Sequence, residues 1–227
     1  MSGLGNLNHT VIQCRECPRL VRWREACAAN PPRRFHGLAY WAKPLPGFGD
    51  PRARVLIVGL APAANGGNRT GRMFTGDRSG DWLYGALHAF GFANQANSDH
   101  RGDGLKLEDC YITAAVRCAP PGNKPLRAEF ERCRSYLVQE LKLFKNLRVV
   151  VVLGKIGFDS FIAAYRENGG VLPKPRPKFG HAVSVVLPDS LRLICSYHPS
   201  QQNTFTGKLT RPMFHRVFEQ ARAVLSS

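Results

Sequence analysis

Residues 149–153 read VVVVL, and no polar side chain interrupts the run. A strand that faces water on one side alternates apolar and polar residues, whereas a strand that is covered on both faces is apolar throughout. Three other short apolar segments resemble it, at 55–59, 111–116 and 191–196. Helical patterns separate these segments, which is typical of βαβ units. The sequence therefore predicts an α/β fold in which helices flank a parallel sheet of four strands.

Apolar residues recur every three or four positions in four further segments, which predicts helices. These segments are 81–90, 130–144, 155–165 and 212–225. Residues 28–50 and 168–181 are rich in Pro, Gly and basic side chains and are predicted to be loops. With 227 residues, the chain is expected to form a single domain over residues 1–227, in which residues 1–13 are flexible.

The chain is strongly basic. It has 32 Lys and Arg against 16 Asp and Glu, a formal charge of +16. Such a charge favours a polyanionic partner, and nucleic acid fits better than a membrane because no apolar run reaches the roughly 18 residues of a spanning helix. The alternative is a generally basic protein without such a partner. The basic, Pro-rich stretch 173–178 is either a phosphate contact or a solvated surface loop.

Seven cysteines are an odd number, and a complete disulfide framework is not expected in a reducing compartment. Cys14 and Cys17 form a CxxC pair, and Cys118 and Cys133 can close a metal site from the other side. Zinc and an iron–sulfur cluster suit four thiolates equally. Alternatively, the CxxC pair is redox-active or incidental, and Cys133 is a buried apolar side chain. The remaining cysteines are predicted to be core residues: Cys27, Cys110 and Cys195.

Two polar segments follow the first and the last predicted strands. Residues 59–77 read GLAPAANGGNRTGRMFTGD, and residues 196–204 read SYHPSQQNT. The first is neither a Walker A sequence nor a dinucleotide-binding fingerprint, since it lacks GK[ST] and GxGxxG. The carboxyl ends of parallel strands share one edge of a sheet, where ligands of open α/β sheets bind. We therefore expect both segments to line one crevice. The N-terminal residues contain no secretory signal, so we expect a cytoplasmic protein.

These segments and the cysteines together resemble the uracil-DNA glycosylase superfamily, and in particular its family 5 (type b) iron–sulfur enzymes. The resemblance rests on five motifs: GLAP (59–62), NRTGR (68–72), FTGD (74–77), RCAPPGNKP (117–125) and HxSxQNTxTGxLT (198–210). It implies a single-domain uracil-DNA glycosylase fold with a central four-stranded parallel sheet flanked by helices. It also implies a monofunctional enzyme that hydrolyses the N-glycosidic bond of uracil and other deaminated or damaged bases in DNA, leaving an abasic site.

The same resemblance implies a cofactor and a cellular setting. The cofactor is a [4Fe–4S] cluster, whose implied ligands are Cys14, Cys17, Cys118 and Cys133. Because the excision requires no electron, its role would be to fasten loops that touch DNA. The implied partner is DNA containing uracil or related damaged bases. We expect a monomer that works in the cytoplasm, associated with the nucleoid.

The catalytic residues that the resemblance implies are His198, Asp77 and Asn123. His198 matches the histidine that donates a hydrogen bond to the base oxygen as negative charge accumulates. Ala61 stands where related families carry Asp, Asn or Glu, so Asp77 is the carboxylate available to position water or to stabilise the cation on the sugar. Alternatively, Asp77 caps the following helix. Asn123 could supply a substitute contact to the base.

The resemblance also assigns the base pocket and the DNA contacts. Phe74 matches the aromatic ring that stacks on the flipped base, and the alternative is a core phenylalanine. Ala114 stands where family 4 relatives carry a base-reading Asn, which predicts looser selectivity. The backbone amides of Leu60 and Ala61 and the side chain of Asn68 complete the predicted pocket. The predicted DNA contacts are Pro199, Ser200, Gln201, Gln202, Asn203, Lys208 and Arg211, with 201–203 filling the gap that the flipped nucleotide leaves.

Two other functions also fit the sequence. The alanines at positions 61 and 114 would suit a non-catalytic iron–sulfur DNA-binding module of the same fold. A zinc-stabilised nucleotide-binding protein would also use the cysteines and the charge. No motif places a lysine where it could form a Schiff base, so strand cleavage is not expected.

Overall fold

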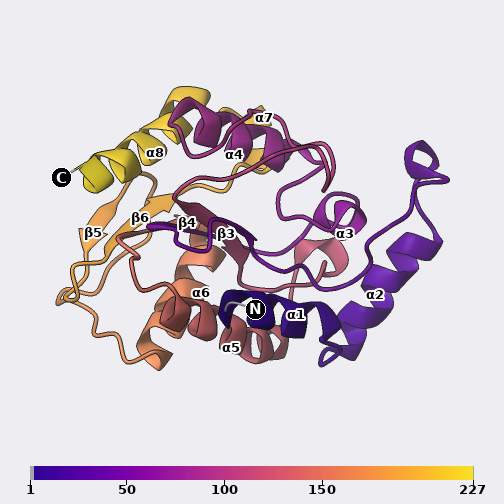
Figure 1. Ribbon diagram of the computed structural model, residues 1–227, viewed down its shortest axis with the longest axis horizontal. Helices are drawn as coiled ribbons and strands as arrows, with labels where there is room; N and C mark the ends of the chain where they lie inside the picture. The colour runs from indigo at the N-terminus through magenta and orange to yellow at the C-terminus, as the bar shows by residue number, and fades with distance from the viewer. Residues whose placement is uncertain (1–2, 227) are drawn as a thin grey trace.

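The computed structural model describes residues 3–226, which form a six-stranded sheet between two layers of helices (Figure 1). Its centre is four parallel strands in the order β3-β2-β4-β6. Their bounds are Val55–Gly59 for β2, Cys110–Ala114 for β3, Val149–Leu153 for β4 and Arg192–Ser196 for β6. The predicted α/β fold with four central parallel strands is confirmed.

Two short antiparallel strands extend the sheet at its edges, and the sequence pattern does not predict them. β1 (Phe48–Gly49) pairs with β3, and β5 (Ser184–Val186) pairs with β6. β1 is too short for an alternating pattern to be visible. β5 leaves Ser184 and Val186 exposed. Apolar periodicity detects strands by their buried faces, so such edge strands escape it.

Helices cover both faces of the sheet. α4 and α8 lie on one face, and α1, α5 and α6 lie on the other (Figure 1). The bounds are α1 Gly3–Gln13, α2 Pro18–Ala29, α3 Gly67–Thr70, α4 Arg78–Ala89, α5 Arg127–Leu143, α6 Gly154–Glu167, α7 Gln201–Phe205 and α8 Arg211–Ser226. Short 3-10 turns lie at Arg33–Phe35 and Pro121–Asn123. The four predicted helices are confirmed as α4, α5, α6 and α8. No helix between residues 3 and 226 is long and apolar enough to cross a membrane.

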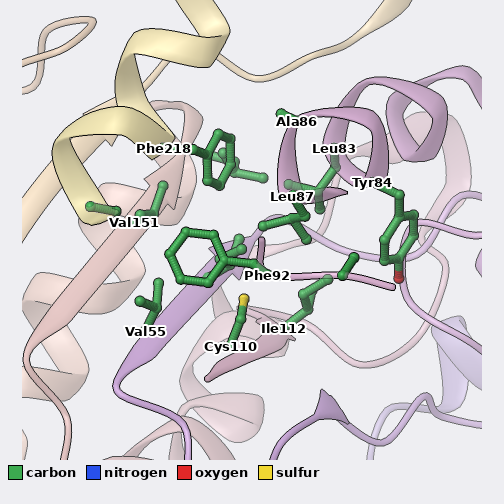
Figure 2. Close-up of a cluster of buried hydrophobic side chains, with 14 of the residues drawn as sticks. Val55, Leu83, Tyr84, Ala86, Leu87, Phe92, Cys110, Ile112, Val151 and Phe218 are labelled. Atoms are coloured by element: carbon green, nitrogen blue, oxygen red, sulfur yellow. The ribbon is translucent and has the colours of Figure 1, made fainter. Parts of the chain in front are cut away.

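Alternate side chains of each central strand enter two separate cores. Val55 of β2 points toward α4 and α8, whereas its neighbour Leu56 enters the core on the other face. Figure 2 shows the first core, in which Phe92 and Phe218 pack over the strands. Because both faces are covered, every position of β2 is buried. This double burial accounts for the uninterrupted apolar runs in the sequence.

The segment 1–13, which is predicted to be flexible, is helical from residue 3 onward. α1 buries Leu4, Leu7 and Val11 in the second core and contacts α5. The spacing of these three residues is the helical one, so the signal is present in the sequence. Residues 1 and 2 lie outside the described part of the chain.

The order of the strands places a topological switch point at the carboxyl edge of the sheet. From β2 the chain passes to β3 on one side and then to β4 on the other. In open α/β sheets, ligands bind beyond the strand ends at such a switch point. The polar segment 60–77 leaves β2 at this edge, and the segment 197–209 leaves β6 there.

Candidate active site and cysteine cluster

His198 lies two residues beyond β6 and is half-buried at the carboxyl edge. It packs against Gly154 of α6, where a methyl group would lie 3.2 Å from Cβ of His198. Its backbone oxygen accepts a hydrogen bond of 2.9 Å from Nδ2 of Asn203. Burial lowers the pKa of His198 to about 4, because the surroundings disfavour the charged ring. At neutral pH the imidazole is therefore uncharged and can donate one hydrogen bond.

Phe74 comes from the other polar segment and lies opposite His198. The two ring centroids are 6.0 Å apart, with 30° between the ring planes. Phe74 is partly buried against the first core and has a φ of +52°, which is uncommon for a residue other than glycine. Its ring extends over the end of β2, where a Cβ on Gly59 would come within 2.8 Å of Cζ. A glycine at position 59 therefore allows the ring to lie there.

Asp77 caps helix α4, which is one of the two roles predicted for it. Its Oδ1 accepts a hydrogen bond of 3.1 Å from the backbone nitrogen of Gly80. Its Oδ2 lies so close to Gly66 that no Cβ fits at that position. Burial raises the pKa of Asp77, although the amide donors of the helix oppose this effect. Its role in positioning water stays a prediction.

The other predicted base-pocket residues lie on the strand ends and loops around this edge. Ala114 ends β3 and is buried, and Leu60 and Ala61 directly follow β2. Asn68 has no exposed surface, and its Nδ2 donates to the backbone oxygen of Arg24 at 3.2 Å. A contact between Asn68 and a base would require the loop to move. The base-pocket assignments stay predictions.

Asn123 lies in a different setting from His198, Phe74 and Asp77. It ends the exposed turn after β3 and has a φ of +56°. The structure thus brings the rings of Phe74 and His198 close together, and Asp77 lies three residues after Phe74 on the same loop. A contact between Asn123 and a base stays a prediction.

The predicted DNA-contacting segment forms helix α7 and the turn after it. Ser200 caps α7, because its Oγ accepts a hydrogen bond of 3.3 Å from the backbone nitrogen of Asn203. The side chain of Asn203 points inward, to the backbone oxygen of His198. Pro199 is buried. The exposed members of the predicted set are Gln201, Gln202, Lys208 and Arg211.

The four predicted cluster ligands gather at one place, which we call the cysteine group. Cys17 at the start of α2, Cys118 after β3 and Cys133 on α5 pack together in a small buried cluster. Cys14 is half-buried and lies within electrostatic range of the other three. All seven cysteines are free thiols. The remaining three lie elsewhere: Cys27 is half-buried on α2, and Cys110 and Cys195 belong to the main cores.

Nitrogen donors reach the sulfur atoms of the cysteine group. Nη1 of Arg24, which is 2% exposed, donates to Sγ of Cys118 at 3.0 Å. The backbone nitrogen of Arg117 donates to Sγ of Cys133 at 3.4 Å. Burial raises the pKa of Cys118 to about 11 and that of Cys133 to about 12, so both thiols stay protonated unless a cation binds them. Among residues 3–226, no group of three or more His, Cys, Asp or Glu side chains is arranged so that it could hold a single metal ion.

A fully buried ion pair adjoins the cysteine group, and the sequence does not predict it. Nη2 of Arg117 donates to Oε2 of Glu140 at 2.6 Å, and Thr113 donates to the same oxygen at 2.8 Å. The two charged side chains are 1% and 0% exposed. The pair joins the segment that carries Cys118 to the helix that carries Cys133.

Helical spacing is the sequence signal that could have identified the buried charges. Arg24 lies seven residues after Cys17, and Glu140 lies seven residues after Cys133. Seven residues are two helical turns, so each charged side chain shares a face with a cysteine. The general expectation that charged residues are exposed hides this pattern.

Comparisons with known proteins agree with this architecture. Residues 46–222 match the uracil DNA glycosylase superfamily. The chain is 49% identical over 217 residues to the type-5 uracil-DNA glycosylase of Mycobacterium bovis, covering 95% of this chain and 80% of that protein. It is 48% identical over 213 residues to the type-5 uracil-DNA glycosylase of Thermus thermophilus, covering 94% of each chain. For the type-5 uracil-DNA glycosylase of Pyrobaculum aerophilum, the identity is 43% over 213 residues, 94% of this chain and 89% of that protein. The chain therefore belongs to the uracil-DNA glycosylase superfamily.

Proposed function

We propose that this protein is a monofunctional DNA glycosylase of base excision repair. It hydrolyses the N-glycosidic bond of uracil and of other deaminated or damaged bases in DNA, and it leaves an abasic site. Family membership supports the proposal. The observation that carries it is the uncharged ring of His198 opposite the ring of Phe74 at the carboxyl edge of the sheet.

In the proposed reaction, the damaged base first leaves the duplex and enters this edge. Phe74 stacks on one face of the base, and the N–H of His198 donates to a base oxygen. As the glycosidic bond breaks, its electron pair moves onto the base, so that the oxygen becomes more negative. A neutral donor that is already in place stabilises this charge more in the transition state than in the ground state. Water then adds to the sugar carbon, and its proton neutralises the departed base.

The positive charge that develops on the sugar calls for a group near the attacking water. We propose that Asp77 positions this water and stabilises the sugar cation. One of its oxygens is engaged by the Gly80 amide, and the carboxylate lies on the same loop as Phe74. Ala61 offers no polar atom in its side chain. Ala114, which offers no bidentate reader, supports the proposal of broad base selectivity.

We further propose that Cys14, Cys17, Cys118 and Cys133 hold a [4Fe–4S] cluster. Two of the buried sulfurs accept N–H donors, as is common for cluster ligands, and the group joins α2, α5 and the segment after β3. Hydrolysis requires no electron, so the bound cluster would hold these elements together. Iron and acid-labile sulfide in protein purified without oxygen would support the assignment. Zinc in their place would contradict it.

The proposed enzyme works as a single-domain monomer on nucleoid DNA in the cytoplasm. Its charge of +16 supplies the sequence-independent part of DNA binding. Lys208 and Arg211 are exposed beside α7 and are proposed to meet phosphates.

A duplex that carries a single uracil tests the proposed function. The DNA is incubated with the cluster-containing protein and then divided, and one half is treated with alkali. We expect scission at the uracil only in the alkali-treated half, and none in a control duplex with thymine. Scission without alkali would contradict the monofunctional reaction. No scission at all would instead favour the non-catalytic iron–sulfur DNA-binding module.

A further inference from the structure

Phe205 is an exposed aromatic side chain beside the candidate active site. It ends α7 and is 67% exposed, more than any other Phe, Tyr or Trp among residues 3–226. The next is Trp23 at 37%. Exposing a phenylalanine ring to water is unfavourable, and an isolated exposed ring carries no functional meaning by itself. The contacts of α7 with His198 and with Arg78 are what place this ring beside the candidate active site.

The helix that carries Phe205 is fastened to His198. Asn203 donates from its side chain to the backbone oxygen of His198 at 2.9 Å, and its own backbone oxygen accepts from the nitrogen of Leu209 at 2.9 Å. Leu209 is 1% exposed, so the turn after α7 is anchored in the core. The backbone of this short helix is therefore anchored close to His198, and Phe205 lies at its end.

The end of the segment 60–77, which carries Phe74 and Asp77, also lies close to Phe205. Arg78, the residue after Asp77, places its guanidinium carbon 4.3 Å from the centre of the Phe205 ring. Its Nε donates to Oγ1 of Thr204 at 3.4 Å. Arg78 is itself exposed, so this cation–π pair lies on the surface where the two pocket loops meet.

A base that leaves the duplex leaves a gap in the stack, and an apolar side chain can fill it. The polar residues 201–203 suit this task less well than an aromatic ring, and Asn203 is already bonded inward. We propose that Phe205 inserts into the gap in the duplex that the flipped nucleotide leaves, and that Arg78 orients the ring and meets a flanking phosphate. This inference rests on the proposed function, because it assumes that a base is flipped.

The first test compares duplex with single-stranded substrate. A single strand has no stack to fill, so Phe205→Ala should slow single-turnover excision of uracil from a duplex by about 10- to 100-fold. Excision from the same strand without its complement should change by less than about twofold. The matched control is Val171→Ala, which removes an equally exposed apolar side chain from the loop 168–181. Equal losses on both substrates, or no loss on the duplex, would overturn the proposal.

A second test needs no catalysis, so it separates this inference from the proposed enzyme activity. The probe is a duplex with a stable abasic-site analogue and an adjacent 2-aminopurine, whose fluorescence responds to stacking. Saturating wild-type protein should change the emission, and Phe205→Ala should remove at least half of that change while Phe205→Trp retains it. If both variants behave like the wild type, Phe205 lies outside the gap, and the exposed ring then belongs to another interface.

Discussion

The candidate pocket and the cysteine group are neighbours that are built in opposite ways. Ala61 lies two residues after β2 and also packs against the cysteine group. At the pocket, His198 is uncharged and Phe74 lies close against a glycine. At the cysteine group, Arg24, Arg117 and Glu140 are buried as charged residues. The hydrogen-bond donor of the pocket is thus neutral, whereas the cysteine group contains buried charged side chains.

This difference matches the charges that each region must stabilise. At His198, the negative charge on the base develops only during the reaction, and a permanently charged donor would stabilise the ground state as well. Thiolates bound to a cluster carry permanent negative charge, which buried guanidinium groups can offset. Breaking each arrangement should therefore change a different property: stability near the cysteines, and turnover in the pocket.

The largest effect is expected from Glu140→Gln. Removing the carboxylate leaves Arg117 charged and buried, and its Nε and Nη1 already lack partners. Breaking such a pair typically lowers the free energy of unfolding by about 3–5 kcal/mol. Denaturant unfolding followed by circular dichroism measures this loss. The matched control is Glu131→Gln on the same helix, whose partner Arg127 is 92% exposed, so the loss should stay below about 1 kcal/mol.

His198→Ala should abolish most of the turnover while leaving binding intact. Removing one preoriented donor to a developing anion typically slows catalysis by about 100- to 1000-fold. The Kd for duplex DNA should change by less than about threefold, because the donor acts mainly in the transition state. Single-turnover excision and fluorescence anisotropy give the two quantities. Parallel losses in rate and affinity would show that His198 only binds DNA.

Two substitutions at Asp77 separate capping from catalysis. Asn caps helices about as well as Asp, so Asp77→Asn should retain the stability of α4 and lose only the carboxylate charge. We expect excision to slow by about 10- to 100-fold, with the melting temperature nearly unchanged. Asp77→Ala should lose the cap as well, at a cost of about 1 kcal/mol. An unchanged rate in Asp77→Asn would leave Asp77 as a cap alone.

The sequence predicts the pocket side of the molecule better than the cysteine side. The four central strands are visible because double burial makes them mostly apolar, and in β2 and β4 no polar side chain interrupts the run. The loops after β2 and β6 are visible as polar segments between apolar runs. Phe205 and Arg24 are not, because their significance depends on partners 127 and 94 positions away. Spacing offers Cys118 and Cys133 as partners of Cys14 and Cys17 but leaves zinc and an iron–sulfur cluster equally open, and only the resemblance to a family favours the cluster. Contacts between distant segments have no local pattern, and this is the physical limit of reading a single sequence.

The smallest expected effect concerns the titration of His198. Its pKa is about 4 in the folded protein and 6.5 in an unfolded chain, so between these values only the unfolded chain binds the proton. The contribution of His198 to the free energy of unfolding is therefore fully present above pH 6.5 and is lost as the pH falls toward 4. Because the ring is only half-buried, we expect about 1–2 kcal/mol between pH 7 and pH 4.5. His198→Gln should lack this part of the pH dependence in urea unfolding.

NMR titration of the His198 ring gives the direct comparison. The ring signal should stay at its neutral position until the pH approaches 4. A midpoint near 6.5 for His198 would mean that water reaches the ring freely. The pocket would then hold a partly charged donor at neutral pH, and its contrast with the charge-rich cysteine group would no longer account for how the base anion is stabilised.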